Sequence, residues 1–169
     1  IIDLSKIESG EAKLNYKEFE LTENLKNLHI ESFEKAKEKN LILQWLISDN
    51  IYLVYSDPIR FRQIVRILID NALKFTSEGS ITVKACIDDT QLTIAVKDTG
   101  IGIAEDMREA IFEPFRQVEM AMKRKFGGTG LGLTIARKLA HMLDGDIFLK
   151  SEPGQGSTFY FKHPHTNQF

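Results

Sequence analysis

The sequence predicts an α+β (α/β) domain in which a mixed β-sheet carries helices on one face. Three observations lead to this class. Apolar residues make up 43% of the 169 residues, which is enough for a sizeable core. Patterns of helical and strand period follow one another, but they do not alternate strictly as strand–helix–strand units. Two long, half-apolar helices, over 58–75 and 131–143, are the natural cover for one face of the sheet.

The first predicted elements are the end of a helix, a strand, a complete helix and a second strand. Apolar positions at helical spacing over residues 1–9 stop at Gly10, which indicates the end of a longer helix. A strand is predicted over 14–21, followed by a helix that Thr22 caps and whose charged back faces solvent. Alternating apolar residues then predict a strand over 41–47.

The next predicted element is the helix over 58–75. Asp57 and Pro58 form a strong helix start, because the Asp side chain accepts from first-turn amides and Pro loses only an unpaired donor. Beyond that helix, the pattern predicts two hairpin strands over 81–87 and 92–96. A Gly-rich stretch over 99–130 follows, with one short helix at 105–112, and such a long irregular stretch is usually functional. The second long helix over 131–143 and two closing strands over 147–149 and 159–161 complete the chain's predicted elements.

Composition and charge exclude several classes of protein. The 22 basic and 24 acidic residues give a net charge of −2, so no strong field attracts nucleic acid or an anionic membrane. No apolar run approaches the roughly 20 residues of a membrane span. One cysteine, Cys86, closes no intrachain disulfide, so we expect a reducing, cytoplasmic setting. The chain opens without Met, which indicates a fragment of a longer protein.

The helix over 58–75 carries two stripes. One is apolar throughout and forms the expected core face, with Phe61, Val65, Leu68, Ala72 and Phe75. The other contains Ile64, Ile67, Asn71 and Lys74. An amide and an ammonium therefore lie one turn apart, and they suit magnesium and a phosphate. Taken alone, Asn71 and Lys74 also fit the solvated edge of an amphipathic helix.

Asp98 follows the second hairpin strand and falls on the apolar side of its alternation. A carboxylate on such a face needs hydrogen-bond donors. An acid that accepts from an adenine amine, with glycines that admit a ligand close to the backbone, would explain the run from Asp98 through Gly100 and Gly102 to Ile103. An Asp that turns the chain by bonding its own loop amides is the alternative.

A glycine-rich run, Gly127-Gly128-Thr129-Gly130-Leu131-Gly132, leads directly into the helix over 131–143. Unpaired amides and the positive end of a helix attract anions, so the run is a phosphate seat in physical terms. It is not a P-loop, because no Gly-Lys-Ser or Gly-Lys-Thr follows. It is not the dinucleotide fingerprint either, because Ile135 replaces the third glycine. A flexible hinge fits the glycines equally well.

Five motifs occur in one order and spacing: Asn71-Ala72-Leu73-Lys74-Phe75, Asp98 to Ile103, Phe112-Glu113-Pro114-Phe115, Gly127 to Gly132, and Gly154-Gln155-Gly156-Ser157-Thr158-Phe159. Over residues 14–162 the chain resembles the catalytic ATP-binding domain of two-component sensor histidine kinases, which share a fold with gyrase-type ATPases. The resemblance implies a two-layer sandwich of a mixed sheet and three helices, with a flexible ATP lid over 103–126. Residues 1–10 look like the end of the dimerisation and phosphoacceptor hairpin, which leaves 11–169 as the catalytic domain.

The resemblance implies a role for each matching residue. Asn71 would ligate magnesium, Lys74 would contact phosphate and Phe75 would lie against the adenine. Asp98 would bind the adenine amine. The other implied contacts to ATP lie in the glycine boxes, the lid and the last strand, at Gly100, Gly102, Ile103, Lys125, Gly128, Thr129, Gly130, Leu131, Gly132 and Thr158.

The implied activity is transfer of the γ-phosphoryl group of Mg-ATP to a histidine of the protein's own dimerisation domain. A response regulator receiver domain would be the next partner. The full-length protein would be a homodimer, whereas the 169-residue chain alone could be a monomer.

Two departures from the family pattern keep other functions open. None of the four histidines has the setting of the phosphoacceptor. Ile67 stands one turn before Asn71, where the family usually offers an oxygen, and Asp70 lies about 100° round the helix from Asn71. A regulatory module that binds nucleotide without chemistry is one alternative. An ATPase or protein-serine kinase of the same fold is the other.

Overall fold

The computed structural model describes residues 13–47, 52–114 and 130–165. Its strands are β1 (Lys17–Glu20), β2 (Ile42–Leu46), β3 (Leu53–Ser56), β4 (Ser80–Ile87), β5 (Gln91–Asp98), β6 (Asp146–Glu152) and β7 (Gly156–Pro164). Its helices are α2 (Leu21–Glu38), α3 (Pro58–Phe75) and α5 (Gly132–Met142), with two 3₁₀ turns, η1 (Glu105–Met107) and η2 (Ala110–Phe112).

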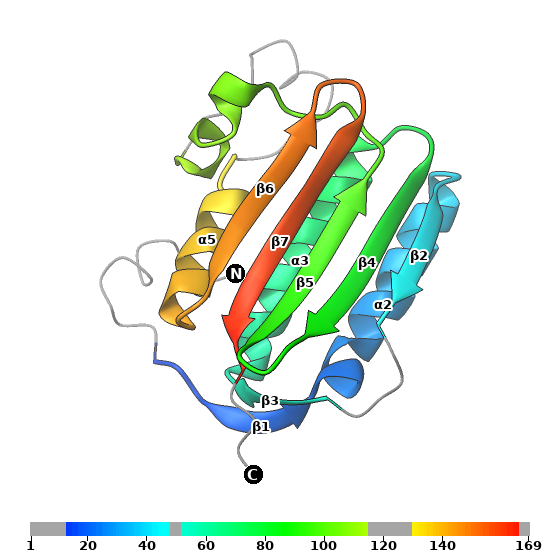
Figure 1. The fold of residues 1–169 in the computed structure, drawn as a ribbon. Coiled ribbons are helices and arrows are strands. Elements are labelled where there is room, and N and C mark those ends of the chain that lie inside the picture. Colours follow the sequence, from blue (N-terminus) through cyan, green and yellow to red (C-terminus); the bar gives the residue numbers. More distant parts are fainter. Residues whose placement is uncertain (1–12, 48–51, 115–129, 166–169) are drawn as a thin grey trace.

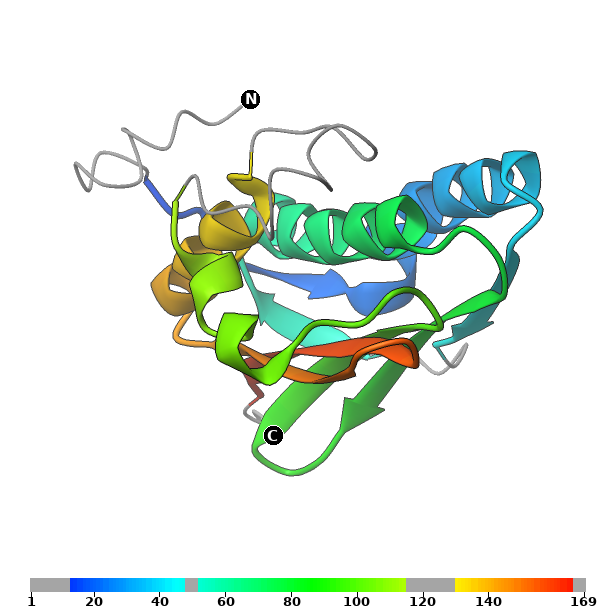
Figure 2. The same ribbon diagram turned by 90° about the horizontal axis from the view of Figure 1, so that it is seen from above.

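The main sheet has five strands in the order β2-β4-β5-β7-β6. β2 runs parallel to β4, and the other pairs are antiparallel, so the sheet is mixed. The three α-helices lie on one face of this sheet, and the described part of the chain leaves the other face open (Figures 1 and 2). A small second sheet pairs β1 with β3. The predicted fold class is confirmed.

The core fills the space between the helices and the inner face of the sheet. On β5 the residues Leu92, Ile94 and Val96 are fully buried, and their outward neighbours are not. Phe61 of α3 lies 5.1 Å from Phe161 of β7, measured between ring centroids, so aromatic contact joins the two layers.

The start of α3 follows the prediction. The Asp57 side chain accepts from the amides of Ile59 and Arg60 at 3.0 and 3.1 Å, and Pro58 is the first helical residue. Asp57 also accepts from the amide of Asn15 at 2.9 Å. One side chain therefore caps the helix and attaches the N-terminal segment to it.

Two predicted details of the first half are wrong. Helix α2 begins at Leu21, its N-cap is Glu20, and Thr22 does not cap it. Leu21 is fully buried, and burial of this side chain outweighs the capping preference of the residue that follows. The strand predicted over 14–21 is only Lys17–Glu20, and it belongs to the small sheet with β3.

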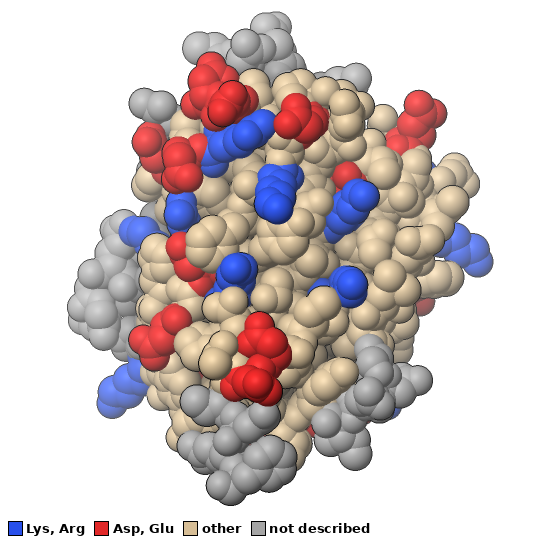
Figure 3. Space-filling model, viewed as in Figure 1, with Lys and Arg blue, Asp and Glu red and all other residues tan. Residues whose placement is uncertain are grey.

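The short helix predicted at 105–112 is two separate 3₁₀ turns, η1 and η2. The long helices α2 and α3 each have 18 residues. Among the described residues, no helix combines the length and apolar character that a bilayer crossing requires. Charged side chains on the open face of the sheet are visible in Figure 3.

Candidate nucleotide site

Asp98 is the last residue of β5 and continues its buried alternation, with 5% of its surface exposed. The carboxylate therefore faces the helix layer, as the sequence predicts. Oδ1 accepts from the amide of Gly100 at 2.8 Å. Burial raises the pKa of the Asp98 carboxyl, while backbone hydrogen bonds at Gly100 and Ser157 act in the opposite direction.

The bond from Gly100 is the loop turn that the alternative interpretation of Asp98 requires. It does not exclude a ligand, because an ionised carboxylate has about four acceptor positions and the two backbone bonds leave room for another donor. A buried acceptor of this kind discriminates strongly between a ligand that donates and one that does not. An adenine amine is such a donor, whereas the same position of guanine is an acceptor.

The glycines after Asp98 are required by the packing of the chain itself. A Cβ on Gly100 would lie 2.3 Å from the carbonyl oxygen of Phe75, and one on Gly102 would lie 2.0 Å from that of Glu152. Gly102 also has a φ of +69°, which favours glycine. The motif alone suggests that these glycines admit a ligand close to the backbone. The structure shows a nearer cause, which is the close approach of two other segments.

Helix α3 joins this loop to the start of α5. The amide of Ile101 donates to the Phe75 carbonyl at 3.4 Å, so the C-terminal end of α3 contacts the loop after Asp98. A Cβ on Gly132, the first residue of α5, would lie 3.5 Å from the Ile67 side chain. Asn71 is one turn from both Ile67 and Phe75, so it lies between the two contacts.

The start of α5 keeps the features of an anion seat. Gly130 has a φ of +71°, and the N-cap residue Leu131 makes no side-chain hydrogen bond to the first turn. Within the described residues, the N-cap side chain therefore leaves the first amides of α5 uncapped, and these amides carry the positive end of the helix dipole. This end of α5 is beside Ile67 of α3, one turn from Asn71.

Lys74 and Phe75 contact each other on α3. The Lys74 ammonium lies 5.0 Å from the centroid of the Phe75 ring. Burial lowers the pKa of Lys74. The lysine therefore covers the ring that the resemblance assigns to the adenine, and a nucleotide seated on Phe75 would have this ammonium beside it.

Thr158 is placed differently from its predicted role. In the register of β5 and β7, Asp98 pairs with Ser157, whereas Thr158 pairs with Lys97. Directly paired residues share a face, so Thr158 lies on the open face, opposite to Asp98. Ser157 is the residue beside Asp98, with 6% exposure, and its Oγ is 2.8 Å from that of Ser151. The alternation of Phe159 and Phe161 could have identified Ser157.

Several predicted residues lie outside the described part of the chain: Lys125, Gly128, Thr129 and the lid segment 115–126. The described part of the lid begins at Ile103, whose amide donates to Ser151 Oγ at 2.8 Å. Ile103 is thereby attached to Ser151 of β6, the same serine that contacts Ser157.

A contact that the sequence pattern does not indicate fixes η2, where the described part of the lid ends. Phe112 packs against Phe159 with ring centroids 6.4 Å apart, and the Arg137 guanidinium lies 4.5 Å from the Phe112 ring. Thr134 Oγ1 donates to the Phe112 carbonyl at 2.9 Å. Arg137 also pairs with Glu109 at 3.1 Å. Helix α5 therefore fixes η2, although 25 residues separate Phe112 from Arg137 and local pattern carried no signal.

A magnesium ion at this site would have few protein ligands. Among the described residues, no three His, Cys, Asp or Glu side chains are grouped to hold a metal ion. Magnesium bound chiefly through phosphates and water needs only one or two protein oxygens. Asn71, which is half-buried between the two contacts of α3, fits that mode of binding.

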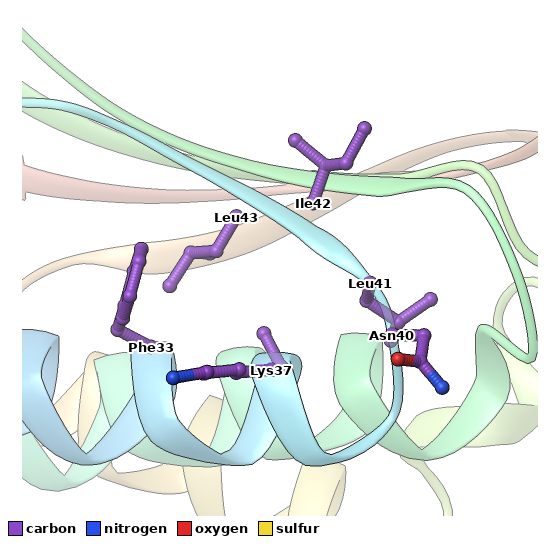
Figure 4. A pocket seen from close by; sticks show the side chains of 7 residues that line it. Phe33, Lys37, Asn40, Leu41, Ile42 and Leu43 are labelled. Atoms are coloured by element: carbon purple, nitrogen blue, oxygen red, sulfur yellow. The ribbon is translucent and has the colours of Figure 1, made fainter.

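A groove elsewhere on the molecule is distinct from this site. It lies between the end of α2 and the edge strand β2, and Figure 4 shows Phe33, Lys37, Leu41 and Leu43 among its lining. None of the residues predicted to bind ATP lines it. The groove is at the β2 edge of the sheet, and β4 separates β2 from the central strand β5, which carries Asp98.

The family model described as histidine kinase-, DNA gyrase B-, and HSP90-like ATPase matches residues 56–167. This is more than half of the chain, and the chain belongs to this family of ATPases. Its curated relatives include the sensor histidine kinase RcsC of Escherichia coli (strain K12), 39% identical over 165 residues, which cover 97% of this chain and 17% of RcsC. The sensor protein GacS of Pseudomonas syringae pv. syringae is 40% identical over 166 residues, with coverages of 95% and 18%.

Solved structures of histidine kinases have the same fold as this chain. Full-length ShkA in complex with AMPPNP superposes with a TM-score of 0.83 at 30% identity, over 96% of this chain and 34% of ShkA. The catalytic domain of histidine kinase ThkA gives 0.78 at 28% identity, over 90% of this chain and 97% of that domain. The resemblance to the catalytic ATP-binding domain of sensor histidine kinases is confirmed. The chain spans less than a fifth of the length of RcsC and GacS.

Proposed function

We propose that this domain binds Mg-ATP and donates the γ-phosphoryl group to a histidine of its own dimerisation domain, from which a response regulator receiver domain takes it. One observation carries the proposal. Asp98 is a buried acceptor beside the point where the end of α3 meets its loop, and the uncapped start of α5 faces the same helix two turns away. An adenine acceptor and a phosphate seat are thus held by one rigid helix.

The residues of the chain divide the work of binding. Asp98 would accept from the adenine amine, and Phe75 would lie against the ring. Lys74 and the first amides of α5 would neutralise and orient the phosphates. Magnesium would supply charge neutralisation at the phosphate oxygens, with Asn71 as its protein ligand. In place of Thr158, we assign Ser157 to the base, because Ser157 is the residue paired with Asp98.

The transfer itself needs positioning more than covalent chemistry from this chain. The bond between the γ-phosphorus and the bridging oxygen breaks, and a bond from that phosphorus to a histidine nitrogen forms. ADP leaves, and the histidine proton passes to a base. The donor domain contributes the fixed geometry of the phosphates, and the dimerisation domain contributes the nucleophile.

The test is to mix the 169-residue chain and Mg-ATP with the dimerisation hairpin as a separate polypeptide and to measure acid-labile phosphate on the hairpin. We expect labelling that needs both polypeptides and disappears with Asp98→Ala. The control is Lys97→Ala, the neighbour on the other face. ATP binding without any transfer would contradict the kinase proposal. Labelling of the chain alone would contradict the assignment of the acceptor to the hairpin.

Ile67 favours a second candidate, a regulatory module that binds nucleotide without transferring phosphate. Its side chain faces the first residue of α5, so a methyl group is presented where an oxygen would assist a metal. Magnesium tolerates retained waters, and we therefore expect slow transfer in place of none. Ile67→Asn should raise the transfer rate and tighten its magnesium dependence, with Ile67→Leu as the apolar control. An unchanged rate and magnesium dependence in folded Ile67→Asn would show that position 67 does not act on the metal.

A further inference from the structure

The sheet face opposite the helices carries four lysines on four successive strands: Lys84, Lys97, Lys150 and Lys162. The register places them around a common centre. Lys97 pairs with Thr158, which in turn pairs with Lys150. Tyr160 is between Ala95 and Phe148 in the next outward row, and Ala95 pairs with Lys84. Figure 3 shows this group of basic side chains in the middle of the open face.

These lysines are positioned but not neutralised. The Lys150 ammonium lies 5.9 Å from the Tyr160 ring centroid, and that of Lys162 lies 5.1 Å from the Phe148 ring centroid. Within the described ranges, none of the four forms a salt bridge. Asp146, which pairs with Lys162 in the sheet, is engaged by Arg137 and His141 of α5.

We propose that this lysine face is a docking surface for an acidic protein domain. Its charge is complementary to carboxylates. The lysines surround half-buried Tyr160 of β7, and Phe148, which is 47% exposed, lies beside Tyr160 on the edge strand β6. An apolar and aromatic centre with charged groups around it is the arrangement of a protein interface, where the charges set orientation and partner choice. The four ammonium groups would meet acidic side chains, and Phe148 would enter an apolar depression in the partner.

The margins of the face favour a compact partner over a long polyanion. Asp88 and Asp89, both exposed, lie in the turn between β4 and β5 at one end of the strands, and exposed Glu152 lies at the other end of the face. A nucleic-acid strand or an anionic bilayer would extend over these carboxylates and be repelled by them. A protein domain need only cover the centre. The net charge of −2 also provides no general attraction for polyanions.

Docking there would leave the nucleotide site accessible. Lys97 and Asp98 are consecutive residues on opposite faces of β5, as are Thr158 and Ser157 on β7. A partner on the lysine face and a nucleotide at Asp98 are therefore compatible, and the inference does not depend on the proposed phosphotransfer.

The experiment is a titration of the ¹⁵N-labelled 169-residue chain with hexa-L-glutamate, followed by NMR. This peptide is a probe for a carboxylate-rich surface, and it is short enough to bind the centre of the face without reaching the acidic margins. We expect shifts concentrated in β5, β6 and β7. The double variant Lys97→Glu/Lys150→Glu should weaken binding at least about tenfold, because it reverses two of four charges. The matched control is Lys17→Glu/Lys26→Glu, with the same charge change on β1 and α2, and it should weaken binding less than about twofold. Lys97→Arg/Lys150→Arg should keep the affinity.

Three results would overturn the proposal. Equal loss of binding in the control variant would mean that hexa-L-glutamate responds only to total charge. Tighter binding of oligouridylate than of hexa-L-glutamate, lost in Lys97→Glu/Lys150→Glu and in Tyr160→Leu, would assign the face to nucleic acid. Tighter binding to phosphatidylserine vesicles, lost in the same charge variant, would assign it to a membrane. Denaturation midpoints of the variants at Lys97 and Lys150 should match that of the wild type, since the four lysines form no salt bridges among the described residues. The control variant loses the exposed ion pair between Lys26 and Glu23, so its midpoint should be slightly lower.

Discussion

The two faces of the five-stranded sheet use the same strands for different purposes. On β5, Asp98 faces the helices at 5% exposure, and Lys97, its neighbour in sequence, faces outward. The inner face combines an apolar core with one carboxylate, whereas the outer face combines aromatic rings with lysines. Because strand side chains alternate, one register separates a buried acceptor from an exposed basic surface. Substituting neighbouring residues on one strand tests this separation directly.

The largest expected effect concerns the core itself. Phe161, on the inner face of β7, is fully buried and packs against Phe61. Its neighbour Tyr160 lies on the open face. We expect Phe161→Ala to lower the free energy of unfolding by about 3–5 kcal/mol through lost burial and a cavity. Tyr160→Ala should cost less than about 1 kcal/mol. Chemical denaturation of both variants measures the difference, and equal losses would mean that the open face is packed against something.

The next effect concerns the glycines of the turn that leads into β7. Gly154 and Gly156 both have positive φ, at +77° and +99°. A Cβ on Gly156 would lie 2.0 Å from the Asp98 carbonyl oxygen, whereas one on Gly154 would meet nothing within 4 Å. Gly154→Ala should therefore show only backbone strain, about 1–2 kcal/mol. Gly156→Ala should lose roughly 2 kcal/mol more, because β5 and β7 must separate. Matching denaturation curves for the two variants would contradict this close approach.

Nucleotide affinity should distinguish the two faces of β5. Asp98→Ala removes the buried acceptor, and we expect at least about a 100-fold loss of AMPPNP affinity together with loss of adenine selectivity. Lys97→Ala should change the affinity less than about twofold. Titration calorimetry with AMPPNP and its guanine counterpart measures both quantities. If Asp98→Ala binds as tightly as the wild type, the adenine assignment is wrong.

The same site has a pH signature. Only the ionised carboxylate accepts from the adenine amine without a competing proton, and burial raises the pKa of Asp98. Affinity should therefore be full well above that pKa and fall as the pH decreases through it, earlier than for an ordinary Asp. Asp98→Asn, which we expect to bind the nucleotide weakly at any pH, should lack this pH dependence of the affinity. A wild-type affinity that stays constant down to the ordinary range of Asp would contradict the burial of the carboxylate.

Much of the fold follows from local pattern, and the exceptions have physical causes. Asp57 and Pro58 fixed the start of α3 correctly because a cap depends on adjacent residues. The buried alternation of β5 placed Asp98 on the inner face for a similar reason. The predicted helix cap at Thr22 is wrong because tertiary burial of Leu21 decides where α2 begins.

The motifs locate the segments of the candidate site, but they do not fix the face on which each side chain lies. A shift of one residue along a strand moves a side chain to the other face. The resemblance implies a contact to ATP at Thr158, whereas the register puts Ser157 beside Asp98. The contact of Arg137 with Phe112 joins residues far apart in sequence, and no periodicity within α5 indicates it.

The smallest expected effect concerns His163, a buried imidazole on the inner face of β7. Its Nε2 lies 2.9 Å from Ser56 Oγ, and Phe61 and Phe161 pack around it. Burial lowers the pKa of His163. A backbone hydrogen bond at Pro164 acts in the opposite direction, and the smaller effects of His165 and Asp144 lower and raise it, respectively. In the unfolded chain the imidazole takes up a proton near its ordinary pKa, whereas the folded chain resists it. The unfolded state therefore binds more protons below that pKa, and stability falls as the pH decreases.

Above the ordinary histidine pKa this contribution to stability should be fully present, and it should be lost as the pH falls toward the lowered pKa of the folded state. One proton limits the slope to about 1.4 kcal/mol per pH unit. His163→Gln keeps a hydrogen-bonding group near Ser56 and removes the titration, so its unfolding free energy should vary less between neutral and mildly acidic pH. His141→Gln is the matched control, because His141 is exposed and bonds Asp146 at the surface of α5. Denaturant melts of the three proteins across this range measure the slopes. If His163→Gln keeps the full slope of the wild type, the inner face does not exclude the proton at His163, and the contrast between the two sheet faces ends at β7.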